Sequence, residues 1–184
     1  MSRRLLRLTL LVRCVVSLAF AAYLVAAHPE SNPALARGFI PFGLADGALA
    51  FMLAILVLSA GWHAGIAMVA TIDGVIRIAA ALALHFGPGA PDFSLTVVLF
   101  VGVLAAVSFS LGVLELGEAK RLRRQIGRNP VSVALAAAGL ATIALAVVAF
   151  VATPLPDTSR RLLIAGAILE SATLLLAAIG AGRE

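Results

Sequence analysis

Six ionisable side chains interrupt long apolar stretches of the sequence. They are Arg13, Asp46, Asp73, Arg77, Glu115 and Glu170. A charge at the centre of a membrane helix costs about 2.5–3.5 kcal/mol, whereas a Leu, Ile or Val returns about 0.3–0.6 kcal/mol. Charged groups at that depth usually face the protein interior and pair with one another. The chemistry open to such residues is ion pairing, or the binding of a proton or an ion.

Four of these residues are predicted to meet in one place. Asp73 and Arg77 are four residues apart with the acid first, which is the favourable order for a pair on one helix face. At 1.5 Å per residue, Asp46, Arg77 and Glu170 each lie about 10–13 Å from the outer ends of their predicted helices. We therefore expect a buried cluster of Asp46, Asp73, Arg77 and Glu170, with Arg77 at its centre. Its three acids exceed its one guanidinium, so a proton could balance the charge.

The predicted cluster has three interpretations. It is either an ion-pair network that fixes helix register, which is the favoured reading, or a site that binds protons or translocates ions. In the third reading the four positions are exposed at the surface or are placed at the wrong depth. Arg13 and Glu115 are interpreted differently: Arg13 is expected to snorkel to the headgroups, and Glu115 to face the interface near Lys120 and Arg121. Both would then serve topology and not chemistry.

The composition is that of a polytopic membrane protein. The 184 residues are 62% hydrophobic and 12% charged, whereas about a quarter of the residues of a soluble domain are charged. The net charge of +5 could suggest a nucleic-acid partner, but the basic residues gather at segment ends and do not interleave with aromatic residues. The single cysteine, Cys14, excludes a disulfide framework within the chain.

Six apolar stretches reach the roughly 20 residues needed to cross a bilayer. None of them alternates polar and apolar residues as a barrel strand would, so the predicted fold is all-α. The first stretch is predicted to be a retained helix and not a signal peptide, because Arg13 interrupts it and it has spanning length. The predicted spans are residues 8–27, 39–60, 64–85, 93–116, 131–151 and 162–181.

A basic segment at residues 117–130 sets the predicted topology. It is expected to be a cytoplasmic loop, and it carries Lys120, Arg121, Arg123, Arg124 and Arg128. Placing it inside puts both termini inside, with nine basic residues on the cytoplasmic side and three outside, as the positive-inside rule requires. The expected location is a bacterial inner membrane. The five basic side chains could also hold anionic lipid headgroups, at about 1 kcal/mol each.

An internal repeat is also predicted. Pro29, Pro88 and Pro154 each follow a predicted helix, and aligning the chain on them gives three tandem hairpins at residues 8–60, 64–116 and 131–181. The first helices match through Ala21, Ala80 and Ala146. The second helix of each hairpin carries two small residues four apart, an arrangement that lets helix backbones approach closely in lipid. We expect the hairpins to pack through these seams, which are Gly43 with Gly47, Ser108 with Gly112, and Ala167 with Ser171.

The GLADG segment at residues 43–47, the segment FSLGVLELGEAKRLRRQIG at residues 109–127, the prolines and the triplication resemble the HdeD family of small six-helix bacterial membrane proteins. The resemblance covers nearly the whole chain. It implies a helical bundle without a catalytic motif and a link to acid resistance. The chain departs from the family's commoner pattern at Asp73, Arg77 and Glu170, where neutral residues are expected.

No enzyme motif is present: the sequence lacks GxSxG, HExxH, Walker and Rossmann patterns. His28, His63 and His85 have no second His or Cys at helical spacing, so no metal site or cofactor is expected. The leading expectation is a non-enzymatic membrane component, to which the family resemblance adds a role in stress or acid tolerance. One alternative is a small proton- or ion-coupled transporter or channel that uses the cluster. Another is an accessory or scaffolding subunit, or a homo-oligomer, whose Gly43/Gly47 seam contacts a membrane partner.

Overall fold

The described part of the chain folds into a bundle of six helices. The computed structural model describes residues 2–59, 61, 64–86, 93–127, 130–151 and 156–181, and these ranges contain no strand. The all-helical class predicted from the sequence is therefore confirmed. The helices are α1 (Ser2–Ala27), α2 (Asn32–Ser59), α3 (Ala64–Phe86), α4 (Phe93–Ile126), α5 (Pro130–Val151) and α6 (Pro156–Ala181).

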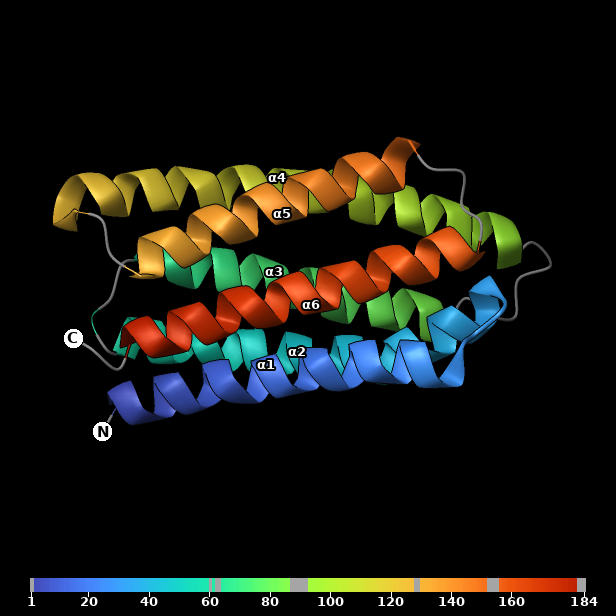
Figure 1. Cartoon of the computed structure of the whole chain (residues 1–184), viewed down its shortest axis with the longest axis horizontal. Helices are drawn as coiled ribbons and strands as arrows, with labels where there is room; N and C mark the ends of the chain where they lie inside the picture. The colour runs from blue at the N-terminus through green and yellow to red at the C-terminus, as the bar shows by residue number, and fades with distance from the viewer. Residues whose placement is uncertain are drawn as a thin grey trace.

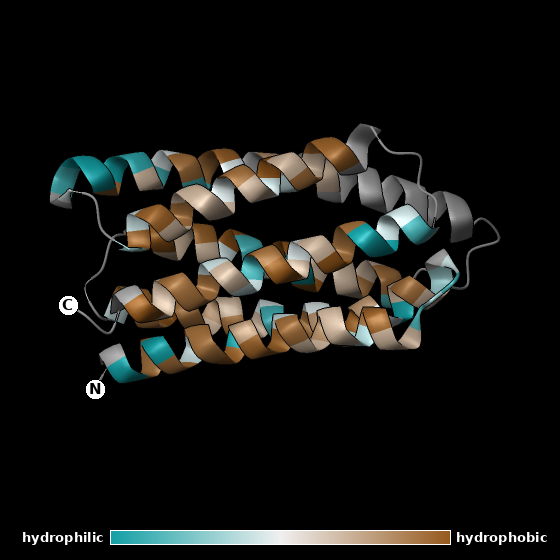
Figure 2. Cartoon of the chain, viewed as in Figure 1, coloured by the Kyte–Doolittle hydropathy of each residue, from teal (hydrophilic) through white to brown (hydrophobic). Residues whose placement is uncertain are grey.

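Length, composition and exposure identify an integral membrane protein. Among the described residues, α1, α2, α3, α5 and α6 each contain a segment long and apolar enough to span a bilayer. Large apolar side chains also point outward from the bundle: Val15 is 64% exposed, Ile55 66% and Leu140 61%. Figure 2 shows hydrophobic residues along most of the helix lengths. An outer surface of this kind suits hydrocarbon and not water.

The helices are longer than the apolar stretches that predicted them. Helix α2 begins at Asn32 and not at residue 39, because Ser31 caps it: the Ser31 hydroxyl accepts the backbone N–H of Ala34 at 3.4 Å. Helix α6 likewise begins at Pro156, a residue that suits a helix start.

The predicted loop at residues 117–130 is mostly helix. Helix α4 continues to Ile126 through Ala, Leu, Glu, Lys and Arg, all good helix formers. Gly127, with a φ of 77°, follows the helix end and suits a left-handed C-cap. Lys120, Arg121, Arg123 and Arg124 are exposed on this last part of α4, and Arg128 lies outside the described residues. We call this end of the bundle the basic end. Helix α1 begins and α6 ends at the same end (Figure 1).

Three helix pairs lie closest together: α2 with α3, α4 with α5, and α1 with α6. A Cβ atom added to Gly47 would lie 3.0 Å from the carbonyl oxygen of Gly74, and one added to Gly74 would lie 2.9 Å from that of Gly47. Gly112 and Gly139 show the same reciprocal approach between α4 and α5, at 2.7 Å in both directions. These contacts require glycine, since a side chain would force the backbones apart.

Each seam of small residues therefore contacts a helix outside its own predicted hairpin. Between α6 and α1, the Ser171 hydroxyl lies 3.3 Å from the Cys14 carbonyl oxygen. Ala167 is buried beside α1 and α2, and Ser108 is half-buried. The Gly43/Gly47 seam faces α3, so it is covered within the chain and offers no free surface to another protein.

Two apolar layers fill the bundle. The basic-end layer contains Leu6, Leu10, Cys14, Leu53, Ala54, Val57, Ala67, Ala70, Leu174 and Ala178. The opposite-end layer contains Phe20, Ala21, Leu24, Leu35, Ala36, Phe39, Phe42, Ala80, Leu84 and Ala167. Four ionisable residues lie between the two layers along their helices, namely Asp46, Asp73, Arg77 and Glu170, and Arg13 lies at the edge of the basic-end layer, directly before Cys14.

Candidate functional site

Arg13 is a buried ion-pair partner, and the prediction that it snorkels to the membrane surface is wrong. Its side chain is only 5% exposed. Its Nε donates to Asp46 Oδ1 at 2.9 Å and its Nη2 to Asp46 Oδ2 at 2.7 Å, which is the strong bidentate geometry. Since α1 begins at Ser2 and not at residue 8, Arg13 lies about 16 Å along the helix. That depth places it level with the acids of the other helices.

The helical spacing of Arg13 relative to its neighbours could have indicated that it is buried. It shares one helical face with Leu6, Leu10 and Ser17, which are all buried. Residues three and four apart line one side of a helix. Because apolar residues surround α1 on every side, hydropathy alone does not mark this face as the interior one.

Asp46 is completely buried, at 0% exposure. It contacts Arg13 across the α1–α2 contact, and its Oδ2 also lies 3.1 Å from Arg77 Nε on α3. The small residues on either side of it make this possible: a Cβ added to Gly43 would lie 3.1 Å from the Arg77 carbonyl oxygen, and one added to Gly47 would lie 3.3 Å from Arg77 Cβ. The close α2–α3 approach therefore sets the Asp46–Arg77 distance.

Arg77 and Glu170 join α3 to α6. Arg77 Nη2 donates to Glu170 Oε1 at 2.7 Å, and Arg77 Nε donates to Asp73 Oδ1 at 2.8 Å on its own helix. Arg13 Nη2 lies 2.8 Å from Asp73 Oδ2 and 3.2 Å from Glu170 Oε1. The Ser17 hydroxyl donates to Glu170 Oε2 at 3.3 Å.

These contacts define the charge cluster, which is Arg13, Asp46, Asp73, Arg77 and Glu170. The structure brings together all four residues that the sequence placed in a cluster and adds Arg13. Each of the three carboxylates contacts both guanidinium groups, at distances between 2.7 and 3.2 Å. With the acids ionised, two positive charges face three negative ones. The cluster then has a formal charge of −1.

Oxygen atoms of Asp46, Asp73 and Glu170 lie within 4.8 Å of one another, which is close enough for one metal ion to bridge them. The arginine nitrogen atoms lie against these same carboxylates. A divalent ion there would be repelled by both guanidinium groups. The geometry therefore favours a monovalent species, and not a divalent metal ion, as the group that balances the charge.

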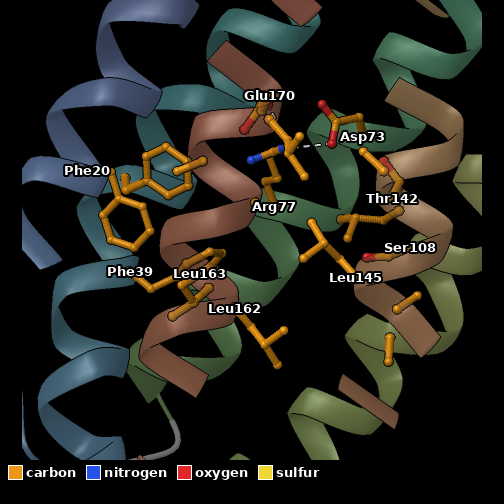
Figure 3. A pocket seen from close by; sticks show the side chains of 18 of the residues that line it. Phe20, Phe39, Asp73, Arg77, Ser108, Thr142, Leu145, Leu162, Leu163 and Glu170 are labelled. Carbon is orange, nitrogen blue, oxygen red and sulfur yellow. Dashed lines mark hydrogen bonds and ion pairs between the residues drawn. The ribbon is translucent and has the colours of Figure 1, made fainter. Parts of the chain in front are cut away.

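A cavity of about 320 Å³ adjoins the charge cluster. Asp73, Arg77 and Glu170 line it beside the cluster, and Leu35, Leu84 and Ser159 line it toward the end of the bundle opposite the basic end. Figure 3 shows Arg77 and Glu170 beside this space, with Phe20 and Phe39 on one wall and Leu145 and Ser108 across from them. The cavity exists because, among the described residues, the backbones of α3 and α6 make no close approach.

Glu115 does not join the charge cluster. It is half-buried on α4, and the Thr142 hydroxyl of α5 lies 3.5 Å from its Oε2. The expected neighbour Arg121 pairs instead with Glu118, at 3.5 Å. Glu115 thus faces the α4–α5 contact, one turn beyond Gly112.

No protein-family model, curated protein or solved structure matches this chain. Fold and site together define a class: an integral membrane protein, built as an all-helical bundle, with a buried mixed-charge cluster and an adjoining cavity.

Proposed function

We propose that this chain is a non-enzymatic membrane protein whose charge cluster binds and releases one proton through the cavity. The observation that carries the proposal is the imbalance of three carboxylates against two guanidinium groups in an apolar interior. An uncompensated charge is expensive in such surroundings. A proton removes it at the lowest steric cost, because it needs no additional space.

Asp73 and Glu170 are the groups best placed to exchange the proton. Their side chains are 22% and 17% exposed and line the cavity. Asp46, in contrast, is completely buried and accepts hydrogen bonds from Arg13 Nε and Nη2. Glu170 has fewer constraints than Asp73, since its Oε2 has a weak hydroxyl donor in Ser17 at 3.3 Å. We therefore assign the proton to Glu170 first.

The experiment is infrared difference spectroscopy on the protein in lipid nanodiscs during a pH titration. A protonated carboxyl group gives a carbonyl stretching band apart from that of a carboxylate. We expect such a band to grow on acidification of the wild-type protein and to lack one component in Glu170→Gln. The matched control is Glu118→Gln, which removes a half-buried acid on α4 outside the cluster and leaves that component in place.

A wild-type protein that shows no protonated carboxyl band at any pH at which it stays folded would overturn the proposal. So would an unchanged band in a folded Glu170→Gln protein, unless Asp73→Asn removes it, in which case Asp73 is the proton site.

The second candidate function is a purely structural clamp. The observation in its favour is that every carboxylate contacts both guanidinium groups, so the cluster ties α1, α2, α3 and α6 together. A clamp predicts that Glu170→Gln lowers stability and that no carboxyl group titrates in the wild-type protein. The same spectra and a thermal unfolding curve separate the two functions.

We further infer that the basic end faces the cytoplasm of a bacterial inner membrane, so that the cavity opens toward the outside. The positive-inside rule supports this orientation through Lys120, Arg121, Arg123 and Arg124. The reciprocal glycine pairs at α2–α3 and α4–α5 support the three-hairpin repeat. A relation to the HdeD family, and with it a role in acid tolerance, rests on the sequence resemblance alone.

A further inference from the structure

The cavity is large enough to hold a small organic molecule. Its volume of about 320 Å³ lies at the lower end of the range for ligand pockets, roughly 300–1,000 Å³. A site that served only a proton would need one or two water molecules, each about 30 Å³. The volume therefore leaves room for a larger occupant.

The lining of the cavity divides into a charged end and an apolar body. Asp73, Arg77 and Glu170 form the charged end. Phe20, Phe39, Phe42, Leu145, Leu162 and Leu163 are the large side chains of the apolar body. A few small polar groups, such as Ser108 and Thr142, lie among them. An occupant that fits is apolar over most of its length and charged at one end.

The charged end favours a cation. Arg13 and Asp46 form a bidentate pair and are both almost completely buried, so their charges balance each other. The three cavity-facing residues then have one positive and two negative charges. Arg77 is already paired with Asp73 at 2.8 Å and Glu170 at 2.7 Å, so it leaves little positive potential for an anion.

The aromatic side chains that line the cavity also favour a cation. The Phe20 and Phe42 rings stack with centroids 4.1 Å apart, and Phe39 meets both rings edge to face. Phe42 already lies 5.8 Å from the Arg77 guanidinium carbon, within the range of a cation–π contact. Aromatic faces beside carboxylates are the surroundings in which proteins bind quaternary ammonium groups.

We propose that the cavity binds a small lipophilic monocation, an ammonium group with an apolar body, which competes with the proton for the charge cluster. This inference rests on the proposed function, because the same net negative charge attracts both species. Binding of the cation is non-covalent and is accompanied by loss of the proton from the cluster to water. Linkage requires that the cation bind more weakly as the pH falls.

The test measures binding of benzyltrimethylammonium to the full chain in nanodiscs by equilibrium dialysis. We expect saturable binding of one cation per chain, weakened at least tenfold by Glu170→Gln and by acidification. Glu118→Gln is the matched control, with unchanged affinity. The neutral isostere neopentylbenzene and the anion phenylacetate should show no saturable binding.

A second pair of variants tests the cavity separately from the charge. Ala141→Phe places a ring in the cavity from α5 and should abolish cation binding. Leu140→Phe is the control, because the neighbouring Leu140 is 61% exposed on the outside of the bundle. Both proteins should elute as single species and melt at similar temperatures. Binding that survives Ala141→Phe would overturn the inference, as would equal retention of the neutral isostere.

The two proposals can fail separately. If the wild-type protein shows a titrating carboxyl band but no saturable cation binding, the cation-binding proposal is overturned and the proton-site proposal stands. Saturable cation binding that does not change with pH, together with the absence of any titrating band, overturns both the proton site and the competition and leaves only a cation site.

Discussion

Arg13 is the residue on which the stability of the charge cluster depends most. It contacts all three acids, and it is the most deeply buried positive charge among the cluster residues. Removing it leaves one guanidinium against three carboxylates. Breaking a buried ion pair by removing one partner costs more than the pair contributes, since the remaining charge stays uncompensated.

We predict that Arg13→Leu lowers the free energy of unfolding by about 3–5 kcal/mol, measured by denaturant titration in mixed micelles. Arg7→Leu is the matched control on the same helix, because Arg7 is exposed near the start of α1. It should change the unfolding free energy little. Equal effects of the two substitutions would show that the pairing of Arg13 contributes nothing to stability.

At the residue scale, depth arithmetic could place Asp46, Arg77 and Glu170 at one level, because each lies at a similar distance from the outer end of its apolar stretch, although α2 and α6 begin outside those stretches. Arg13 could not be placed in this way. Arg13 lies near the inner end of the apolar stretch at residues 8–27, where a long side chain can reach the headgroups. Only the packing of α1 against α2 reveals that this side of α1 faces inward.

At the scale of helices, glycine pairs set the distance between α2 and α3 and between α4 and α5. Small residues contribute more in lipid than in water, because there is no hydrophobic force to press helices together. The close approach of α2 to α3 also holds Asp46 against Arg77. Helix packing and site geometry therefore depend on the same contact.

We predict that Gly47→Val destabilises the bundle by about 1–3 kcal/mol, the usual cost of overpacking. The new Cβ would lie 2.7 Å from Ile78 Cγ1 and 3.0 Å from the Gly74 carbonyl oxygen, so the two helices must separate. Gly117→Val is the control, since no heavy atom outside the local helix backbone lies within 4 Å of its added Cβ. Thermal unfolding in detergent measures both, and equal melting temperatures would contradict the prediction.

Helix number and type follow from apolar length, but helix ends do not. Hydropathy marks where hydrocarbon begins, whereas a helix ends where capping and propensity end it. Ser31 starts α2 ahead of its apolar stretch, and the charged residues of 117–126 extend α4 beyond it. The seams could be found as small residues four apart, yet their partners, such as Gly74 and Gly139, required the three-dimensional arrangement.

At the scale of the whole molecule, the two ends of the bundle differ. The basic-end layer closes the interior with Leu6, Leu10, Leu53 and Val57. On the other side of the charge cluster the cavity leads toward Leu35, Leu84 and Ser159. Under the proposed function, water and ligands would therefore reach the cluster from the end opposite the basic end.

This asymmetry predicts one-sided labelling in a Cys14→Ser background, which removes the single native cysteine. Ser108→Cys lies in the cavity and should react with a membrane-impermeant thiol reagent added from the side opposite the basic end. Ala67→Cys, in the basic-end layer, is the control and should stay unlabelled from both sides. Labelling of Ser108→Cys from the basic end would show that the bundle is open at that end.

The 2.7 Å contact between Arg77 and Glu170 spans helices whose backbones otherwise stand apart. This ion pair holds α3 and α6 together. If either partner is neutralised, the attraction between the two helices falls and the gap between them can widen. A proton on Glu170 would therefore also loosen the contact between α3 and α6, two helices that line the cavity. We therefore expect the protonation of Glu170 and the distance between α3 and α6 to change together.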